Sequence, residues 1–302
     1  HVPLAHPQQH SAQVTEADWV APGKPLAASG NSGRTPQPHL HQQAQRRAQL
    51  RSPTRPYHLC SLLRHRDNGI SEYLVNGRPE VGDTVEAAVV DPRLATPLHL
   101  PVGRQLTYRV EGPGLPPDRE TSLQVELTLL GQFRLVSDSG ASAAFEENNG
   151  VLAFYDRQGP RDGFLDIWLL ANGLTPLSES AVSWQDAPSA RLLPLGLLPR
   201  AILWLLHPLG RGLDSRYRRQ LDPGHGLWQQ QGQHELRLGG RVLRAKTESL
   251  INHEQGFHTI SCRFGSQSWQ AQLTELGLAG DEGVPGWQIS SNSDKNLLER
   301  SS

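Results

Sequence analysis

The chain has 302 residues, which is enough for two domains of ordinary size. Its 23 prolines and 29 glycines, with 36% hydrophobic and 20% charged residues, indicate a globular protein rich in turns and argue against long helical bundles. The 29 basic and 30 acidic residues nearly cancel, so no basic excess gathers phosphates, and we expect no nucleic-acid partner.

The chain contains no methionine and its first residue is His1. Because translation starts at methionine, we interpret the chain as a fragment or a processed form. A missing signal peptide then says nothing about the compartment, since that segment would precede the residues present.

In chain order, residues 30–38 concentrate loop-forming residue types and predict an exposed turn, and a strand is expected to begin directly after it at His39. The polar, basic stretch 42–56 ends in prolines and is typical of a connector. We therefore predict a domain boundary near Ser52, with one domain over residues 1–51 and another over 52–289.

The second domain is predicted to be mainly β, as one domain or two subdomains. Residues 147–150 are expected to form the turn of a hairpin between strands at 143–145 and 151–155, and residues 164–170 form an apolar run expected to be a strand. Residues 187–221 are predicted as the helical region, and 290–302 as a disordered tail. The other expected strands show alternating polarity or antiparallel spacing; they are 105–110, 123–130, 132–136, 234–238, 241–246, 259–264 and 268–273.

Two features leave alternatives open. Cys60 and Cys262 are the two cysteines, and they fit either one long-range disulfide or two separate thiols. The most apolar run, residues 192–206, is too short to span a bilayer and contains two prolines and an arginine. It fits either a buried helix or a segment that contacts a membrane surface or a partner.

The candidate chemistry lies in His39-Leu40-His41. Side chains at positions i and i+2 of a strand project from the same face, about 7 Å apart by the strand rise. Two imidazoles can therefore share one pocket, where one coordinates a metal and the other approaches whatever the metal activates. This pattern suits a catalytic zinc site, although such a site needs further ligands.

The stretch around this pair resembles the C-terminal half of the core of lysostaphin-type (LytM-like) zinc metallopeptidases. That family typically reads V-x-x-G-x-x-V-x-x-G-x-x-[IL]-[GA] and then G-x-[ST]-G-x-[ST]-x-x-P-H-L-H. Residues 14–41 here read VTEADWVAPGKPLAASGNSGRTPQPHLH. The resemblance covers residues 1 to about 50, and the matching positions are Val14, Val20, Gly23, Leu26, Gly30, Ser32, Gly33, Pro38, His39, Leu40 and His41.

The resemblance implies an open, mostly antiparallel β-sheet core and a division of labour among three histidines. His41 would be a zinc ligand, whereas His39 and His6 would be catalytic residues beside the water that attacks the peptide bond. Two more zinc ligands, a His and an Asp, lie upstream of the Ala-His strand in this family. Since nothing precedes His1 in this chain, we expect these 302 residues to be inactive by themselves.

The resemblance implies a hydrolase: a metallopeptidase with a Zn2+ cofactor that cuts peptide cross-links of bacterial peptidoglycan and takes stem peptides as its substrate. It also implies a periplasmic or otherwise extracytoplasmic location. The alternative is a metal-free pseudoenzyme that binds the cell wall or regulates another hydrolase. Retention of His6, His39 and His41 favours the enzyme, because degenerate members usually lose these groups.

Overall fold

The structure is a computed structural model. It describes residues 1–21, 23–31, 37–49, 51–66, 69–113, 119–178, 181–196, 212–222, 224–238 and 240–278. The chain divides into two units, His1–Leu59 and Cys60–Ser302. This division follows Leu59, somewhat beyond the boundary expected near Ser52. The expected tail, residues 290–302, lies outside the described residues.

The first unit is held mainly by backbone pairing. Strand β1 (Leu4–Ala5) pairs antiparallel with β2 (His41–Gln42), and β3 (Ala44–Gln45) pairs with β4 (Thr54–Arg55). None of the described hydrophobic side chains of this unit is buried, and Trp19 is 82% exposed. Hydrogen bonds between short segments therefore position its side chains, rather than an apolar core.

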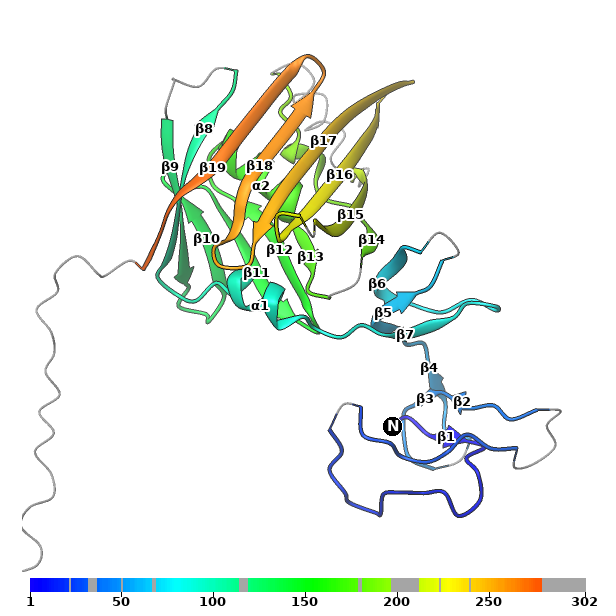
Figure 1. The fold of residues 1–302 in the computed structure, drawn as a ribbon. Coiled ribbons are helices and arrows are strands. Elements are labelled where there is room, and N and C mark those ends of the chain that lie inside the picture. Colours follow the sequence, from blue (N-terminus) through cyan, green and yellow to red (C-terminus); the bar gives the residue numbers. More distant parts are fainter. Residues whose placement is uncertain are drawn as a thin grey trace, which may run out of the picture. The chain divides into compact units, whose positions relative to one another are not determined.

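The second unit is built on one large sheet (Figure 1). Its strand order is β13-β12-β11-β10-β9-β8-β19-β18-β17-β16-β15-β14-β6-β5-β7. Strands β6 and β14 run parallel, whereas β5 with β7 and the neighbouring strands from β14 to β13 in this order pair antiparallel, so the sheet is mixed. The strands are β5 Leu59–Arg64, β6 Ser71–Gly77, β7 Val85–Ala87, β8 Arg104–Glu111, β9 Arg119–Leu127, β10 Phe133–Ser137, β11 Ser142–Asn148, β12 Val151–Gln158, β13 Leu174–Pro176, β14 Val182–Asp186, β15 Asp214–Asp222, β16 Leu227–Leu238, β17 Arg241–Asn252, β18 Gly256–Phe264 and β19 Gln267–Leu278.

The prediction of a mainly β protein is confirmed. Strands β11 and β12 form the predicted hairpin, but its turn is shorter than the predicted residues 147–150. Asn148 pairs with Val151, and the two residues between them have positive φ. Asn149 has φ 50° and Gly150 has φ 72°, as a type I′ turn requires. Asparagine and glycine tolerate this left-handed backbone, which is why the turn could be recognised from the sequence.

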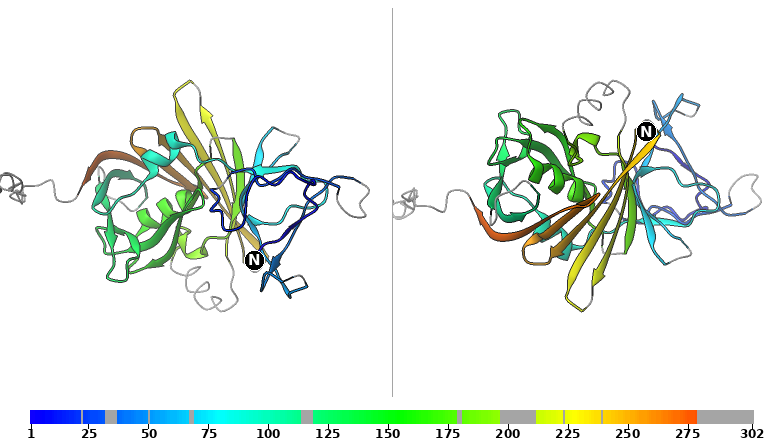
Figure 2. Two further views of the ribbon diagram at one scale, coloured as in Figure 1. Left: turned by 90° about the horizontal axis from the view of Figure 1, so that it is seen from below. Right: turned by 90° about the horizontal axis from the view of Figure 1, so that it is seen from above.

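Within the described part of the second unit, two helices accompany the sheet, α1 (Pro92–Leu98) and α2 (Gly163–Asn172). Figure 2 shows α2 enclosed by the strands of the second unit. The ring of Trp168 on α2 contacts Phe154 of β12 and Phe257 of β18, with ring centroids 4.9 and 5.1 Å apart. The sheet therefore curls around this helix and buries it from both sides.

The prediction of a strand over residues 164–170 is wrong, because these residues belong to helix α2. Each residue from Phe164 to Asn172 is buried, so the helix shows no polar face in its sequence. A continuous apolar run cannot be assigned to strand or helix by periodicity alone. The local signal is Asp162, whose side chain accepts a hydrogen bond from the Leu165 N–H as an N-cap.

The predicted helical region over residues 187–221 is also wrong among the described residues. It contains a single 3-10 turn, Ala190–Leu192, and most of strand β15. In β15 the buried positions are Ser215, Tyr217 and Arg219, so two of the inward-facing side chains are polar and the two-residue period is hidden. Residues 197–211 lie outside the described residues.

No helix in the described ranges is both long enough and apolar enough to cross a membrane. The apolar run 192–206 is described only as far as residue 196. Within that part, Leu192, Leu193 and Leu195 belong to the hydrophobic core around α2.

The Asp162 carboxylate ties α2 to the turn after β10. It accepts hydrogen bonds from the Leu165 N–H at 2.9 Å, from the Ser137 hydroxyl at 2.6 Å and from the Ser139 hydroxyl at 2.8 Å. Burial acts to raise the pKa of this carboxyl group, but these hydrogen bonds outweigh burial and hold the pKa below its usual value.

We expect Asp162→Ala to lower the free energy of unfolding by about 1–2 kcal/mol, because the cap of α2 and its hydroxyl partners are lost. Urea denaturation at neutral pH measures this change. Since the folded-state pKa of Asp162 is depressed, its stabilisation is present above the unfolded pKa and is lost as the pH falls through the folded value. The two proteins should therefore converge in acid. Asp214→Ala, which removes a half-exposed carboxylate, is the control, and an equal loss in both variants would contradict the capping role.

Candidate metal centre

Three short segments of the first unit meet in antiparallel backbone pairing. In the β1–β2 ribbon Ala5 pairs with His41, and Gly30 forms a bridge with His39. The Gly30 N–H donates to the carbonyl of His6 at 2.9 Å, and its own carbonyl accepts from the His39 N–H at 3.2 Å. The segment at Gly30 thus lies between the two parts of the chain that carry the candidate histidines.

Position 30 has room only for glycine, because a side chain there would clash with the backbone of Gln8. A Cβ atom at this position would lie 2.4 Å from the backbone nitrogen and 2.5 Å from the Cα of Gln8. Both distances are far below van der Waals contact, and backbone atoms cannot rotate away as a side-chain tip can. Any other residue at position 30 would therefore separate the segment of His6 from the segment of His39 and His41.

The backbone of His6 adopts a left-handed conformation, with φ 68°. This conformation costs about 1–2 kcal/mol for a residue that carries a Cβ atom. His6 lies where the chain stops pairing with β2 and begins to pair with the segment at Gly30. This change of partner holds the residue in its unusual conformation.

The three imidazoles gather into one cluster. One ligand atom from each of His6, His39 and His41 lies within 4.8 Å of the others, and the ring centroids are 4.8 to 4.9 Å apart. The Nε2 atoms of His39 and His41 are 2.9 Å apart. His6 and His39 are half-buried and His41 is exposed, so solvent reaches the cluster.

The hydrogen bonds of His39 determine which of its nitrogens carries the hydrogen. Its Nδ1 lies 2.8 Å from the carbonyl oxygen of Gln37, which can only accept, so Nδ1 carries a hydrogen. In the neutral ring Nε2 then presents a lone pair, and the Nε2–H of His41 donates to it at 2.9 Å. A proton thus lies between two nitrogens that both point into the cluster.

This donor set fits a divalent transition metal. Nitrogen ligands about 2.0–2.1 Å from a tetrahedral zinc lie about 3.4 Å from one another, and the spacings of the cluster bracket that value. The carbonyl of Gln37 fixes the His39 ring from behind, as the outer partners of metal-bound histidines do. The cluster contains no carboxylate, so a site with a His and an Asp besides His41 needs ligands from elsewhere.

The other sequence candidates do not join this cluster. Cys60 is exposed and Cys262 is buried, and both are free thiols. Burial raises the pKa of the Cys262 thiol to about 12, which makes it a poor nucleophile. His234 is buried in the second unit between Ser215 and Thr247, and burial lowers its pKa to about 4. Both of its ring nitrogens are occupied, as in a structural histidine.

Sequence reasoning selected all three histidines that the structure brings together. It missed the Gln37 carbonyl, because a backbone group leaves no mark in the residue type. It also did not give the reason for Gly30. Comparisons with protein-family profiles, curated proteins and solved structures found no match for this chain. The residues of the histidine cluster and their geometry are therefore the basis on which a function is inferred.

In metal-free protein kept in a chelator, we expect long-range proton–nitrogen NMR spectra to show His39 with hydrogen on Nδ1, because Gln37 accepts from it. Gly30→Ala should bring the His6, His39 and His41 signals to those of solvated histidines, since the segments separate. The exposed His58 serves as the internal control and should not change. Identical spectra for the cluster in both proteins would contradict the role given to Gly30.

Proposed function

We propose that this chain is part of a zinc metalloendopeptidase of the lysostaphin type, which hydrolyses the peptide cross-links of peptidoglycan. The observation that carries the proposal is the convergence of His6 with His39 and His41 on one solvent-accessible point. The motif over residues 14–41 supports the same assignment. In this proposal, a His and an Asp of the kind that the resemblance implies complete the zinc ligands.

Each histidine has a distinct role in this proposal. Bound zinc supplies a Lewis acid that polarises a carbonyl group and acidifies water. His41 would hold the ion through Nε2, with its ring hydrogen moved to Nδ1, and Nε2 of His39 would then be free of the hydrogen bond between the two rings. His39, whose Nδ1 is fixed on Gln37, then accepts a proton from the attacking water. His6 approaches from the other segment and stabilises the negative charge that develops on the substrate oxygen.

The substrate and the compartment follow from the resemblance. Stem peptides bind extended in the groove of the peptidase core, and peptidoglycan places the protein in the periplasm or elsewhere outside the bacterial cytoplasm. The exposed position of His41 is compatible with a polymeric substrate, because a cross-linked wall cannot enter a closed cavity.

A metal-free binding protein is the second candidate, and one observation favours it. The direct hydrogen bond between His39 and His41 satisfies both Nε2 atoms without an ion. In this alternative the cluster is a structural remnant, and the protein binds the cell wall or regulates another hydrolase.

With the residues ahead of His1 included, we expect one zinc ion per chain and release of stem peptides from purified cell walls. His41→Ala should lose the zinc and the activity, because a ligand is removed. His39→Ala and His6→Ala should retain the zinc but lower turnover at least about 100-fold, as loss of acid–base groups does. Elemental analysis measures the metal, and chromatography of the released peptides measures turnover.

His58→Ala is the matched control, since this exposed histidine lies outside the cluster. Zinc retained in His41→Ala would overturn the ligand assignment. Cell-wall binding with neither zinc nor turnover would instead support the metal-free alternative.

A further inference from the structure

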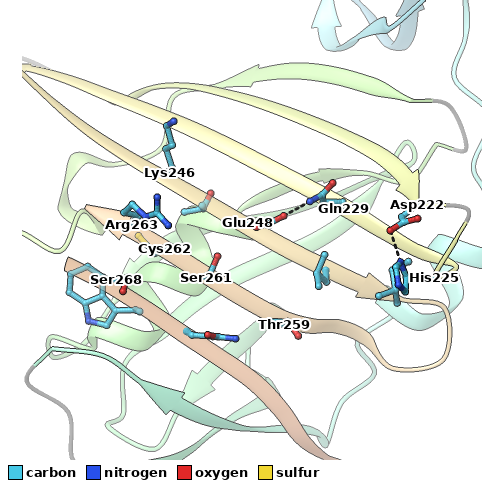
Figure 3. Close-up of a pocket in the computed structure, with 15 residues that line it drawn as sticks. Asp222, His225, Gln229, Lys246, Glu248, Thr259, Ser261, Cys262, Arg263 and Ser268 are labelled. Carbon is cyan, nitrogen blue, oxygen red and sulfur yellow. Dashed lines mark hydrogen bonds and ion pairs between the residues drawn. The ribbon is translucent and has the colours of Figure 1, made fainter. Parts of the chain in front are cut away.

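The second unit carries a polar groove on the face of β16–β19 that points away from α2. Its volume is about 820 Å³. Side chains alternate along these strands, so the residues facing the groove are the ones between the core positions. Figure 3 shows the groove with Lys246 and Arg263 near one end and Asp222 and His225 at the other.

Two cations lie directly opposite each other in the floor of this groove. Lys246 of β17 pairs in register with Arg263 of β18, and the flanking positions in the same row are Gln233 and Ser268. Neither cationic side chain makes an ion pair or a hydrogen bond with another described residue. Like charges directly opposite on neighbouring strands destabilise a sheet, so the two side chains of this row repel each other.

The charged residues next to Lys246 on β17 do have partners, unlike Lys246 itself. Arg244 lies two residues before Lys246 and donates to Glu235 at 2.8 Å. Glu248 lies two residues after Lys246, but its carboxylate accepts from the side-chain amide of Gln229. Glu235 is therefore ion-paired with Arg244, and Glu248 keeps its negative charge in the groove lining, held by Gln229 rather than by either cation. Lys246 and Arg263 both line the groove without an ion pair among the described residues.

In the next rows, strands β18 and β19 offer neutral hydrogen-bonding groups. Ser261 pairs with Gln270, and Thr259 lies two residues before Ser261; all three line the groove. Amides and hydroxyls of this kind both donate and accept, which matches the alternating N–H and C=O groups of an extended peptide. At the far end, Asp222 accepts from His225 at 2.8 Å and provides a carboxylate.

The groove is long enough for a few residues of chain. Lys246, Glu248 and Leu250 line it along β17, which corresponds to about 13 Å at the rise of a strand. An extended peptide of about four residues covers this length.

We infer that this groove binds a short acidic peptide in an extended conformation, with a carboxylate between Lys246 and Arg263 and the peptide backbone along the neighbouring amides and hydroxyls. An anion at that position relieves the repulsion within the cationic pair and makes charge-assisted hydrogen bonds. The site lies in the second unit and needs no metal, so it stands apart from the function proposed for the histidine cluster.

The test is an NMR titration of the whole nitrogen-15-labelled chain with the tetrapeptide Ala-Ala-Glu-Glu. We expect backbone amides of β17 and β18 around Lys246 and Arg263 to shift, and added salt to weaken binding. The neutral peptide Ala-Ala-Gln-Gln-amide should bind at least about tenfold more weakly, since each lost contact to a charged group is worth about that factor.

Lys246→Gln and Arg263→Gln should each weaken binding of the acidic peptide about tenfold. Their thermal midpoints should stay the same or rise, because the repulsion is removed. A structural role would lower the midpoint instead. Arg244→Gln removes a cation from the same strand outside the groove lining and should leave binding unchanged.

Equal affinity for the acidic and neutral peptides, or unchanged binding in both groove variants, would overturn the inference. It would also be overturned if polygalacturonate, an acidic glycan, shifted these amides while the tetrapeptide did not.

Discussion

The close backbone approach at Gly30 is the constraint on which the histidine cluster depends. His39 and His41 are neighbours by strand geometry, but His6 comes from a distant segment and reaches them only through the pairing at position 30. That pairing leaves no room for a Cβ atom, and the first unit has no buried apolar side chain among its described residues to compensate for a lost contact. Backbone hydrogen bonds therefore determine the position of His6, and with it the chemistry that the cluster can perform.

In the second unit, the two faces of the sheet carry cationic side chains in different environments. On the inner face of the sheet Arg219 is fully buried between the rings of Trp184 and Trp228, and it donates to backbone carbonyls, including that of Ser178 at 2.8 Å. A buried cation is tolerated only with such partners. On the outer face Lys246 and Arg263 have none among the described residues. A cationic side chain on the inner face is therefore held by backbone carbonyls, whereas one on the outer face lines the groove. The two-residue period of the strands decides which face a side chain occupies.

The sequence predicted what depends on local patterns. Alternating strands in the second unit, the Asn149-Gly150 turn and the shared face of His39 and His41 were all accessible, because each is decided by neighbouring residues. Helix α2 was missed because burial on every side removes the helical period from the sequence. Strand β15 was missed because Arg219 and Ser215 occupy inward positions, and their burial depends on tertiary partners. The Gln37 carbonyl and the cationic pair also required the fold, since register across strands cannot be read from one segment.

Both candidate sites bring polar groups together by backbone pairing before a ligand binds. Nε2 of His39 and Nε2 of His41 lie 2.9 Å apart and share one proton in a hydrogen bond, so a cation at these nitrogens must displace that proton. Lys246 and Arg263 instead face each other across paired strands without an anion, and an anion bound there removes a repulsion. In both sites the protein has already ordered the groups that would bind, which lowers the entropic cost of binding.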